Sequence, residues 1–318
     1  MATYLENCSI NLTIDQVEAL RQKYKDLSGF YTTILLCFLL SGCSAAIFNL
    51  LFFFLAVRAF RRGRQIGKRY IFLLNRSGSD IFSGCLNLIW VPIDLSASPP
   101  VHGSVDLLHV VRSCLSFWVV SGTYLAMAVS NYIAVKHPLF YRTSLTGRHC
   151  ILFVTAIWFW ASLYTAVVTP LGGTVFFTDS KSSCRSTCQL VLVTLTSVLL
   201  LLCYLLVPAM YLCIMVYLSR SKECAVCGPK DSRAAMAYWK LGLNILLYTF
   251  FGTPVVITVC AAMVDLETVF TDDLCYWFRH LDASRTIFAT RAAAHIIWNA
   301  RATIDPVINC VADRKLLL

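Results

Sequence analysis

Two ionisable side chains of opposite charge lie four residues apart in an otherwise mostly apolar segment near the C-terminal end. They are Arg301 and Asp305, in the stretch RATIDPVINC. A spacing of four residues places two side chains on the same face of a helix, where an arginine and an aspartate can form an ion pair. A second apolar segment carries Arg76 and Asp80, also four residues apart. The pattern therefore predicts that Arg301 and Asp305 share one helix face, and that the charges of both segments need partners if they are buried.

Catalytic chemistry is not indicated by any motif. The histidines are isolated from one another, and no nucleophile stands in a pattern with a base. Cys224 and Cys227 have the spacing of half a zinc site, but a second pair with that spacing is missing. These cysteines, like Cys310, could instead be palmitoylated or inert. We therefore expect no enzymatic activity, no cofactor and no metal site.

Long uncharged segments identify the elements that must hold these charges. The chain has 318 residues, of which 58% are hydrophobic and 14% charged, whereas soluble domains have about 45–50% and about 25%. Five segments of 23 to 31 residues carry no charge, and a membrane-spanning helix needs about 20 apolar residues. The five uncharged segments are 29–57, 113–135, 150–178, 189–219 and 241–264. Two further apolar segments, 70–95 and 284–311, hold the interior charges and bring the number of predicted spans to seven. The fold class is predicted to be an all-α bundle of seven transmembrane helices.

The distribution of basic residues predicts the orientation in the membrane. The first, third and fifth loops and the tail together hold 16 lysines and arginines, against 7 on the other side. Since short cytoplasmic loops are enriched in basic residues, the N-terminus is expected outside and the C-terminus in the cytoplasm. The sequons at Asn7 and Asn11 agree with an outer, glycosylated N-terminus. The predicted domains are an extracellular segment 1–28, a transmembrane domain 29–311 and a cytoplasmic tail 312–318, with the plasma membrane as location. The net charge of +10 is explained by this topology, so we expect membrane lipid and not nucleic acid as a partner.

Four of the fifteen cysteines are expected on the outer side, where disulfides can form. Four cysteines allow three pairings, and the sequence does not choose among them. The candidates are Cys8, Cys184, Cys188 and Cys275.

A series of landmarks in these segments resembles the rhodopsin-like (class A) G-protein-coupled receptors. The landmarks occur in the family's order and cover nearly the whole chain beyond residue 28. The motif at the end of the third segment is similar to the family's D-R-Y followed by PL-x-Y-R-T, and the motif in the seventh is similar to N-P-x-x-Y. The matching residues are Asn49, the stretch NRSGSD ending at Asp80, the stretch SNYIAVKHPLFYRT, Trp158, Pro208, Pro254 in YTFFGTP, and DPVIN.

Several positions depart from the family pattern. Asn131 stands in place of the D-R-Y arginine, between Ser130 and Tyr132. Gly252 stands where the sixth helix usually has tryptophan, and Asn309 where the seventh has tyrosine. The cysteine expected at the outer end of the third helix is absent, so the family's usual disulfide to the second outer loop is not expected.

The resemblance places Asp80 and Asp305 opposite each other at the middle of the membrane. Many relatives bind a sodium ion there, and Arg301 is expected to take the place of that ion. The resemblance thus implies a charge cluster of Asp80, Arg301 and Asp305, in which Arg76 balances the remaining negative charge. Ligand binding would then be insensitive to sodium. A charge at the centre of a membrane costs about 2.5–3.5 kcal/mol even on mild scales. The alternative is that Arg301 faces headgroups or water.

The resemblance also implies a ligand cavity at the outer ends of the third and seventh helices. Since Ser113 stands where amine receptors hold an aspartate, a cationic monoamine is not expected. Arginine and histidine side chains favour an anionic group on a small molecule or short peptide. The alternative is that the arginines extend to lipid headgroups. The candidate ligand-binding residues are His109, Arg112, Ser113, Arg291, His295 and Asn299.

On the cytoplasmic side, the resemblance implies a surface for a heterotrimeric G protein or arrestin. Its candidate residues are Ser130, Asn131, Tyr132 and Pro138. The predicted function is that of a receptor that signals to a cytoplasmic transducer. Because of Asn131, the alternative is an atypical receptor-like protein, a decoy or dimer partner, with weak or no G-protein coupling. A transporter is a further alternative, but transporters of this kind are typically built from repeated halves with broken helices.

Overall fold

The computed structural model describes residues 14–62, 68–96, 102–177, 185–223, 232–264 and 281–312. Within these residues the chain forms seven long helices and one short helix, and no strand, so the predicted all-α class is confirmed. The helices are α2 (Ile14–Arg61), α3 (Lys68–Ser96), α4 (His102–Lys136), α5 (Pro138–Thr143), α6 (Gly147–Phe177), α7 (Arg185–Glu223), α8 (Ser232–Val264) and α11 (Leu281–Ala312).

Four of the described long helices have the length and the apolar composition of membrane spans. The shortest of the seven described long helices, α3, has 29 residues and extends over about 44 Å at 1.5 Å per residue. Helices α2, α4, α6 and α7 are long and apolar enough to cross a membrane, and α8 contains a shorter apolar stretch, Ile245–Thr258. Large apolar side chains on the outside of the bundle, such as Phe54, Phe159 and Leu212, are more than 60% exposed. An exposed apolar surface on helices of this length is typical of a membrane bundle, and the chain is a multi-pass membrane protein.

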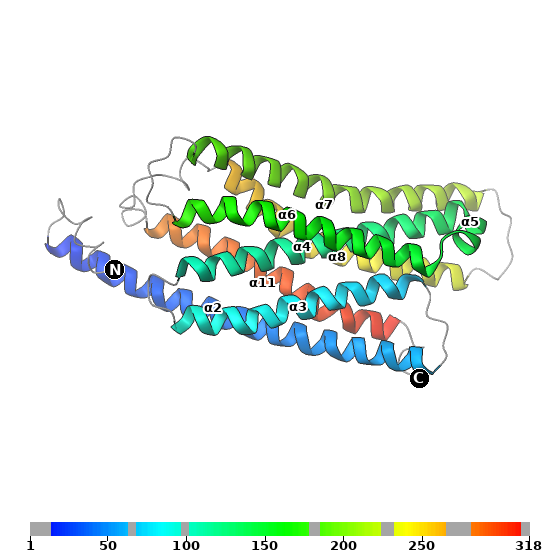
Figure 1. Cartoon of the computed structure of the whole chain (residues 1–318), viewed down its shortest axis with the longest axis horizontal. Coiled ribbons are helices and arrows are strands. Elements are labelled where there is room, and N and C mark those ends of the chain that lie inside the picture. The colour runs from blue at the N-terminus through cyan, green and yellow to red at the C-terminus, as the bar shows by residue number, and fades with distance from the viewer. Residues whose placement is uncertain are drawn as a thin grey trace.

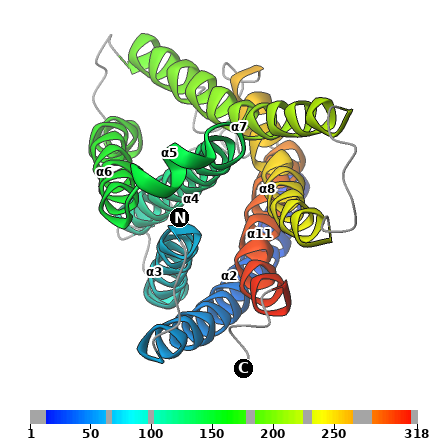
Figure 2. The same ribbon diagram turned by 90° about the vertical axis from the view of Figure 1, so that its right-hand side faces the viewer.

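The helices form a ring when the bundle is viewed end-on (Figure 2). Helix α2 packs against α3 and α11, α4 packs against α3, α6 and α7, and α8 packs between α7 and α11. The described chain begins at one end of the bundle, with α2, and finishes at the other, with α11 (Figure 1). Helix α2 begins at Ile14, so the second half of the predicted N-terminal segment 1–28 continues the first spanning helix.

The two helices that carry no apolar span of their own, α3 and α11, are positioned by close contacts with α2. The Nδ2 atom of Asn49, on α2, donates a hydrogen bond to the carbonyl oxygen of Ala302 at 2.7 Å. On the α3 side, glycines at the contact let the backbones approach, as small residues do in membrane bundles. A Cβ atom added at Gly84 would lie 2.8 Å from the carbonyl oxygen of Gly42. The polar residues of α3 and α11 thereby face the interior of the bundle.

Replacing Gly84 by alanine is expected to lower the free energy of unfolding by about 1–3 kcal/mol, because the added methyl group meets a backbone atom that cannot move aside. Thermal unfolding of the purified protein in lipid nanodiscs measures the effect. Gly78 provides a matched control on the same helix, since a Cβ atom there would meet nothing within 4 Å. Gly78→Ala should be neutral or slightly stabilising through helix propensity. Equal effects of the two substitutions would contradict the close packing of α2 and α3.

Candidate functional site: a buried charge network

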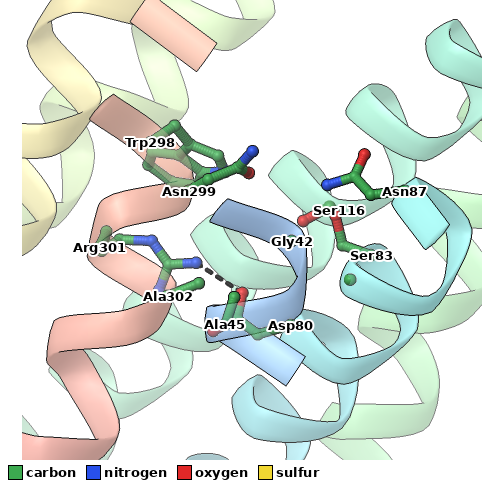
Figure 3. A pocket seen from close by; sticks show the side chains of 11 residues that line it. Gly42, Ala45, Asp80, Ser83, Asn87, Ser116, Trp298, Asn299, Arg301 and Ala302 are labelled. Atoms are coloured by element: carbon green, nitrogen blue, oxygen red, sulfur yellow. Dashed lines mark hydrogen bonds and ion pairs between the residues drawn. The ribbon is translucent and has the colours of Figure 1, made fainter. Parts of the chain in front are cut away.

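Arg301 lies at the centre of the bundle and contacts two carboxylates on different helices. Its Nη1 atom donates to Oδ2 of Asp305 at 2.6 Å, one turn along α11. Its Nη2 atom donates to Oδ1 of Asp80 on α3, also at 2.6 Å (Figure 3). The Arg301 side chain is 0% exposed, and Asp80 and Asp305 are 2% and 1% exposed. The structure thus brings together the three residues that the sequence singled out as a charge cluster.

Arg76 joins this network from α3, but through the carboxylate of the opposite helix. Its Nε atom lies 3.4 Å from Oδ2 of Asp305. The hydroxyl group of Tyr124, on α4, donates to the same oxygen at 2.9 Å, and the guanidinium of Arg76 lies over the Tyr124 ring, 4.8 Å from its centre. Asn309, one turn further along α11, donates from Nδ2 to the carbonyl oxygen of Asp305 at 2.7 Å.

The network has no net charge, because its two arginines balance its two aspartates. Each ion removed from water has a desolvation penalty of several kcal/mol, which only well-placed partners offset. Here Asp305 receives a proton donor from each of α3, α4 and its own helix. The network therefore joins α3, α4 and α11 at one point, and a relative shift of these helices would break an ion pair.

An aromatic layer lies directly above the network. The guanidinium of Arg301 stacks on the ring of Trp298 at 4.5 Å. The same indole contacts Phe117 of α4 at 5.5 Å and Tyr248 of α8 at 6.3 Å between ring centres. Trp298 belongs to α11, so its indole joins α11 to α4 and α8.

Gly252 leaves room for this layer. A Cβ atom at Gly252 would lie 3.1 Å from Cε2 of Tyr204 and 3.6 Å from Cζ3 of Trp298. The hydroxyl group of Tyr204 also hydrogen-bonds to Thr253 Oγ1 at 2.6 Å. Gly252, on α8, has no side chain, and the space beside it is filled by the rings of Tyr204 from α7 and Trp298 from α11.

Three of the predicted ligand-binding residues turn toward α2. Arg112 is buried, and its guanidinium lies 5.9 Å from the ring of Phe38 and 6.0 Å from that of Trp90. The ring of His295 lies 6.4 Å from the same Phe38. Asn299 donates from Nδ2 to Oγ of Ser41 at 3.3 Å, one turn further along α2. We call Phe38, Trp90, Arg112 and His295 the Arg112 cluster.

The remaining ligand candidates are placed only in part. Ser113 is partly buried and accepts a hydrogen bond from Nη2 of Arg112 at 3.3 Å. His109 lies on α4 and Arg291 on α11, but the positions of their side chains are outside the description.

One acidic residue of this region escaped the sequence analysis. Asp94, on α3, is buried and accepts a hydrogen bond from the hydroxyl group of Tyr31 on α2 at 2.5 Å. It lies one turn beyond Trp90. The sequence could have pointed to Asp94, because a carboxylate near the end of the apolar segment 70–95 is unusual. Its burial, however, follows only from the packing of α2 against α3.

The predicted transducer-facing residues lie around the C-terminal end of α4. Ser130 is buried, Asn131 and Tyr132 are partly exposed, and Pro138 is exposed at the start of α5. The hydroxyl group of Tyr132 accepts a hydrogen bond from Nζ of Lys136 at 3.1 Å. Helix α5 is held to α3 by Lys68, whose ammonium group donates to the carbonyl oxygen of Tyr141. Burial raises the pKa of Tyr141, and a hydrogen bond with Ser130 acts in the opposite direction.

Other predicted residues fall outside the described part of the chain. Asn7, Asn11, Cys8, Cys184 and Cys275 belong to undescribed segments, and of Cys188 only the helical backbone is described. Among the described residues, no group of three or more histidine, cysteine or acidic side chains could hold a metal ion.

A comparison with known proteins finds relatives of this chain among receptors. A search of protein-family models finds no match. A G-protein coupled receptor-like protein of Caenorhabditis elegans is 25% identical over 294 residues, which cover 86% of this chain and 74% of the relative. Olfactory receptor 10G7 of Homo sapiens is 32% identical over 107 residues, 32% of this chain and 33% of that receptor. An uncharacterised protein of Caenorhabditis elegans is 26% identical over 151 residues, 43% of this chain and 34% of the relative. The chain thus spans about a third of the length of the last two. These similarities confirm the resemblance to rhodopsin-like receptors.

Proposed function

We propose that the protein is a rhodopsin-like receptor that binds a small molecule or short peptide at its outer end and signals to a cytoplasmic transducer. The observation that carries this proposal is the similarity to a receptor-like relative along 86% of the chain, in a helical bundle that holds the ion pairs of Arg76, Asp80, Arg301 and Asp305 in its interior. The relatives with informative names are receptors and not enzymes. Two further relatives are also named olfactory receptors, which favours a small organic ligand.

We propose that the ligand binds at the Arg112 cluster, at the outer end of the bundle, with an anionic group near Arg112 and His295. An arginine beside aromatic rings binds a planar carboxylate through two parallel hydrogen bonds. Asp94 lies one turn beyond Trp90 on α3, where it accepts a hydrogen bond from Tyr31 of α2, and it would contact a hydrogen-bond donor on the same ligand. In this proposal segment 1–28 is extracellular, 29–311 spans the plasma membrane, and 312–318 is cytoplasmic.

A library of small carboxylic acids and acidic peptides, screened by arrestin recruitment and by thermal shift of the purified protein, tests this site. A hit should lose at least tenfold in potency when His295 is replaced by alanine, because a charge-assisted hydrogen bond contributes about 1.5–3 kcal/mol. His149 lies in an exposed position at the cytoplasmic end, so His149→Ala serves as the control. If only cationic amines were hits, or if the two histidine variants behaved alike, the proposed site would be wrong.

A second candidate function is favoured by Asn131. It stands where rhodopsin-like receptors are expected to have the arginine that contacts the G protein, and it is partly exposed at the end of α4. An uncharged side chain there favours a receptor that binds ligand but couples weakly to G proteins, as a decoy or dimer partner.

Asn131→Arg separates the two candidates. If the native chain couples weakly, basal G-protein signalling should rise several-fold in the variant, because the arginine restores the missing contact. Second-messenger assays at matched surface expression measure it, and Asn131→Gln controls for side-chain size without charge. High basal or ligand-driven signalling of the native chain, with no gain from arginine, would favour the coupled receptor.

A further inference from the structure

The C-terminal end of α2 and the starts of α3 and α6 share one apolar core at one end of the bundle. In this core Ala59 of α2 and Cys150 of α6 belong to the same cluster of buried side chains as Phe72 of α3. Helix α5 joins them, because Nζ of Lys68 on α3 donates to the carbonyl oxygen of Tyr141. The four helices therefore form one edge of the bundle end, on the side opposite α8 (Figure 2).

Six basic side chains stand on this edge. Five are exposed arginines, and the sixth is the partly buried lysine that holds α5. Arg142 follows Tyr141 in the chain, and Arg148 follows Gly147, where an added Cβ atom would lie 3.7 Å from Cδ1 of Ile71 on α3. Both arginines therefore start beside the first turn of α3. We call the six residues the basic patch: Arg58, Arg61, Arg62, Lys68, Arg142 and Arg148.

The chain segments that form the basic patch supply no carboxylate to balance it. Segments 58–79 and 136–178 contain no aspartate or glutamate. The enrichment of basic residues in cytoplasmic loops does not explain this, since acidic residues contribute little to that rule. Segment 220–240, around the connection from α7 to α8, has five basic residues together with Glu223 and Asp231. The uncompensated positive charge is thus concentrated on one side of the bundle end.

Large apolar side chains that face outward lie directly beside the basic patch. Phe54 on α2 is 62% exposed one turn before Arg58, and Leu152 on α6 is 66% exposed one turn after Arg148. Leu139 of α5 is 78% exposed. A soluble anion would contact only the charges of such a surface. A phospholipid brings a phosphate to the arginines, which bind it through parallel hydrogen bonds, and acyl chains to the apolar side chains.

We propose that the basic patch binds the headgroup of an anionic phospholipid with more than one phosphate, such as a phosphorylated inositol lipid. Clusters of about four to eight basic residues beside a membrane-spanning helix attract such lipids. A headgroup with several negative charges lets several arginines contact one molecule, whereas phosphatidylserine offers a single net charge. In the proposed orientation this is the cytoplasmic end, where anionic lipids are concentrated. The inference does not depend on the ligand at the Arg112 cluster or on signalling.

Titration of the purified, detergent-solubilised protein with dioctanoyl phosphatidylinositol bisphosphate, followed by microscale thermophoresis, tests the basic patch. Two paired variants remove charge from its two sides: Arg58→Gln with Arg61→Gln on α2, and Arg142→Gln with Arg148→Gln on α5 and α6. Each pair should weaken binding by about 25-fold, since one basic residue contributes about fivefold. All four side chains are exposed, so we expect both variants to fold, and thermal unfolding without lipid checks this.

The matched control is Arg21→Gln with Lys25→Gln, which removes two exposed basic residues near the other end of α2 and should leave the affinity unchanged. Phosphatidylserine and free inositol trisphosphate, each at the concentration of the probe, should displace it poorly. Native-like binding by both patch variants, or an equal loss in the control, would overturn the proposal. Equal displacement by inositol trisphosphate would indicate a site for a soluble anion, and equal displacement by phosphatidylserine an unselective surface. Either result would also contradict the assignment.

Discussion

Arg301→Ala is expected to destabilise the folded protein by about 3–5 kcal/mol, because it leaves the buried carboxylate of Asp80 without its partner. Arg76 still lies 3.4 Å from Asp305, so that aspartate keeps one cation. Since natural proteins are stable by only about 5–15 kcal/mol, most of the variant should fail to reach the cell surface. Surface labelling in cells and thermal unfolding in nanodiscs measure the two effects.

A charge-balanced double variant separates the loss of an ion pair from the loss of packing. Arg301→Met together with Asp80→Asn removes one charge of each sign and leaves Arg76 and Asp305 paired. Replacing a buried ion pair by uncharged residues of similar volume is often neutral, so this variant should recover most of the stability that Arg301→Ala loses. Normal expression and trafficking of Arg301→Ala would show that the ion pairs contribute little, and the cluster would then be wrong as a structural element.

Trp298→Ala is expected to have an effect of similar size, about 3–5 kcal/mol, because it opens a cavity between α4, α8 and α11. The indole is 6% exposed and contacts Phe117, Tyr248 and the Arg301 guanidinium. Since Gly252 beside it has no side chain, nothing on α8 at that position can refill the space. The midpoint of thermal unfolding should therefore fall by many degrees.

Two further variants calibrate this result. Trp160, on α6, is 49% exposed on the outside of the bundle, so Trp160→Ala should cost much less than Trp298→Ala. Trp298→Phe keeps a ring against Phe117 and Tyr248 and should lie between the two. If Trp298→Ala and Trp160→Ala lowered the midpoint of unfolding by similar amounts, the Trp298 indole would not be filling the space that Gly252 of α8 leaves open.

The class of the protein and the local part of its charge network were predictable from the sequence. Uncharged segments such as 189–219 are long enough to cross a membrane, and this property requires no knowledge of neighbouring helices. The pairing of Arg301 with Asp305 is similarly local, since residues four apart share a helix face whatever packs against them. The partnership with Asp80 was also predictable, but only because the resemblance to a receptor family placed α3 and α11 opposite each other.

Contacts between helices depended on tertiary structure, because the rotation and depth of each helix in the bundle are set by packing and not by spacing along the chain. The sequence suggested that Arg76 balances the cluster, and only the packed bundle places it against Asp305 of α11. The Tyr124 hydroxyl and the burial of Asp94 carried no clear signal for the same reason. Arg112 and His295 were identified by their charge and their position in the sequence. Their side chains turn toward Phe38 of α2 because of the way α2, α4 and α11 are rotated against one another. The sequence by itself thus determined a membrane-spanning helical chain with charges that need partners, and the tertiary structure decided which partners they have.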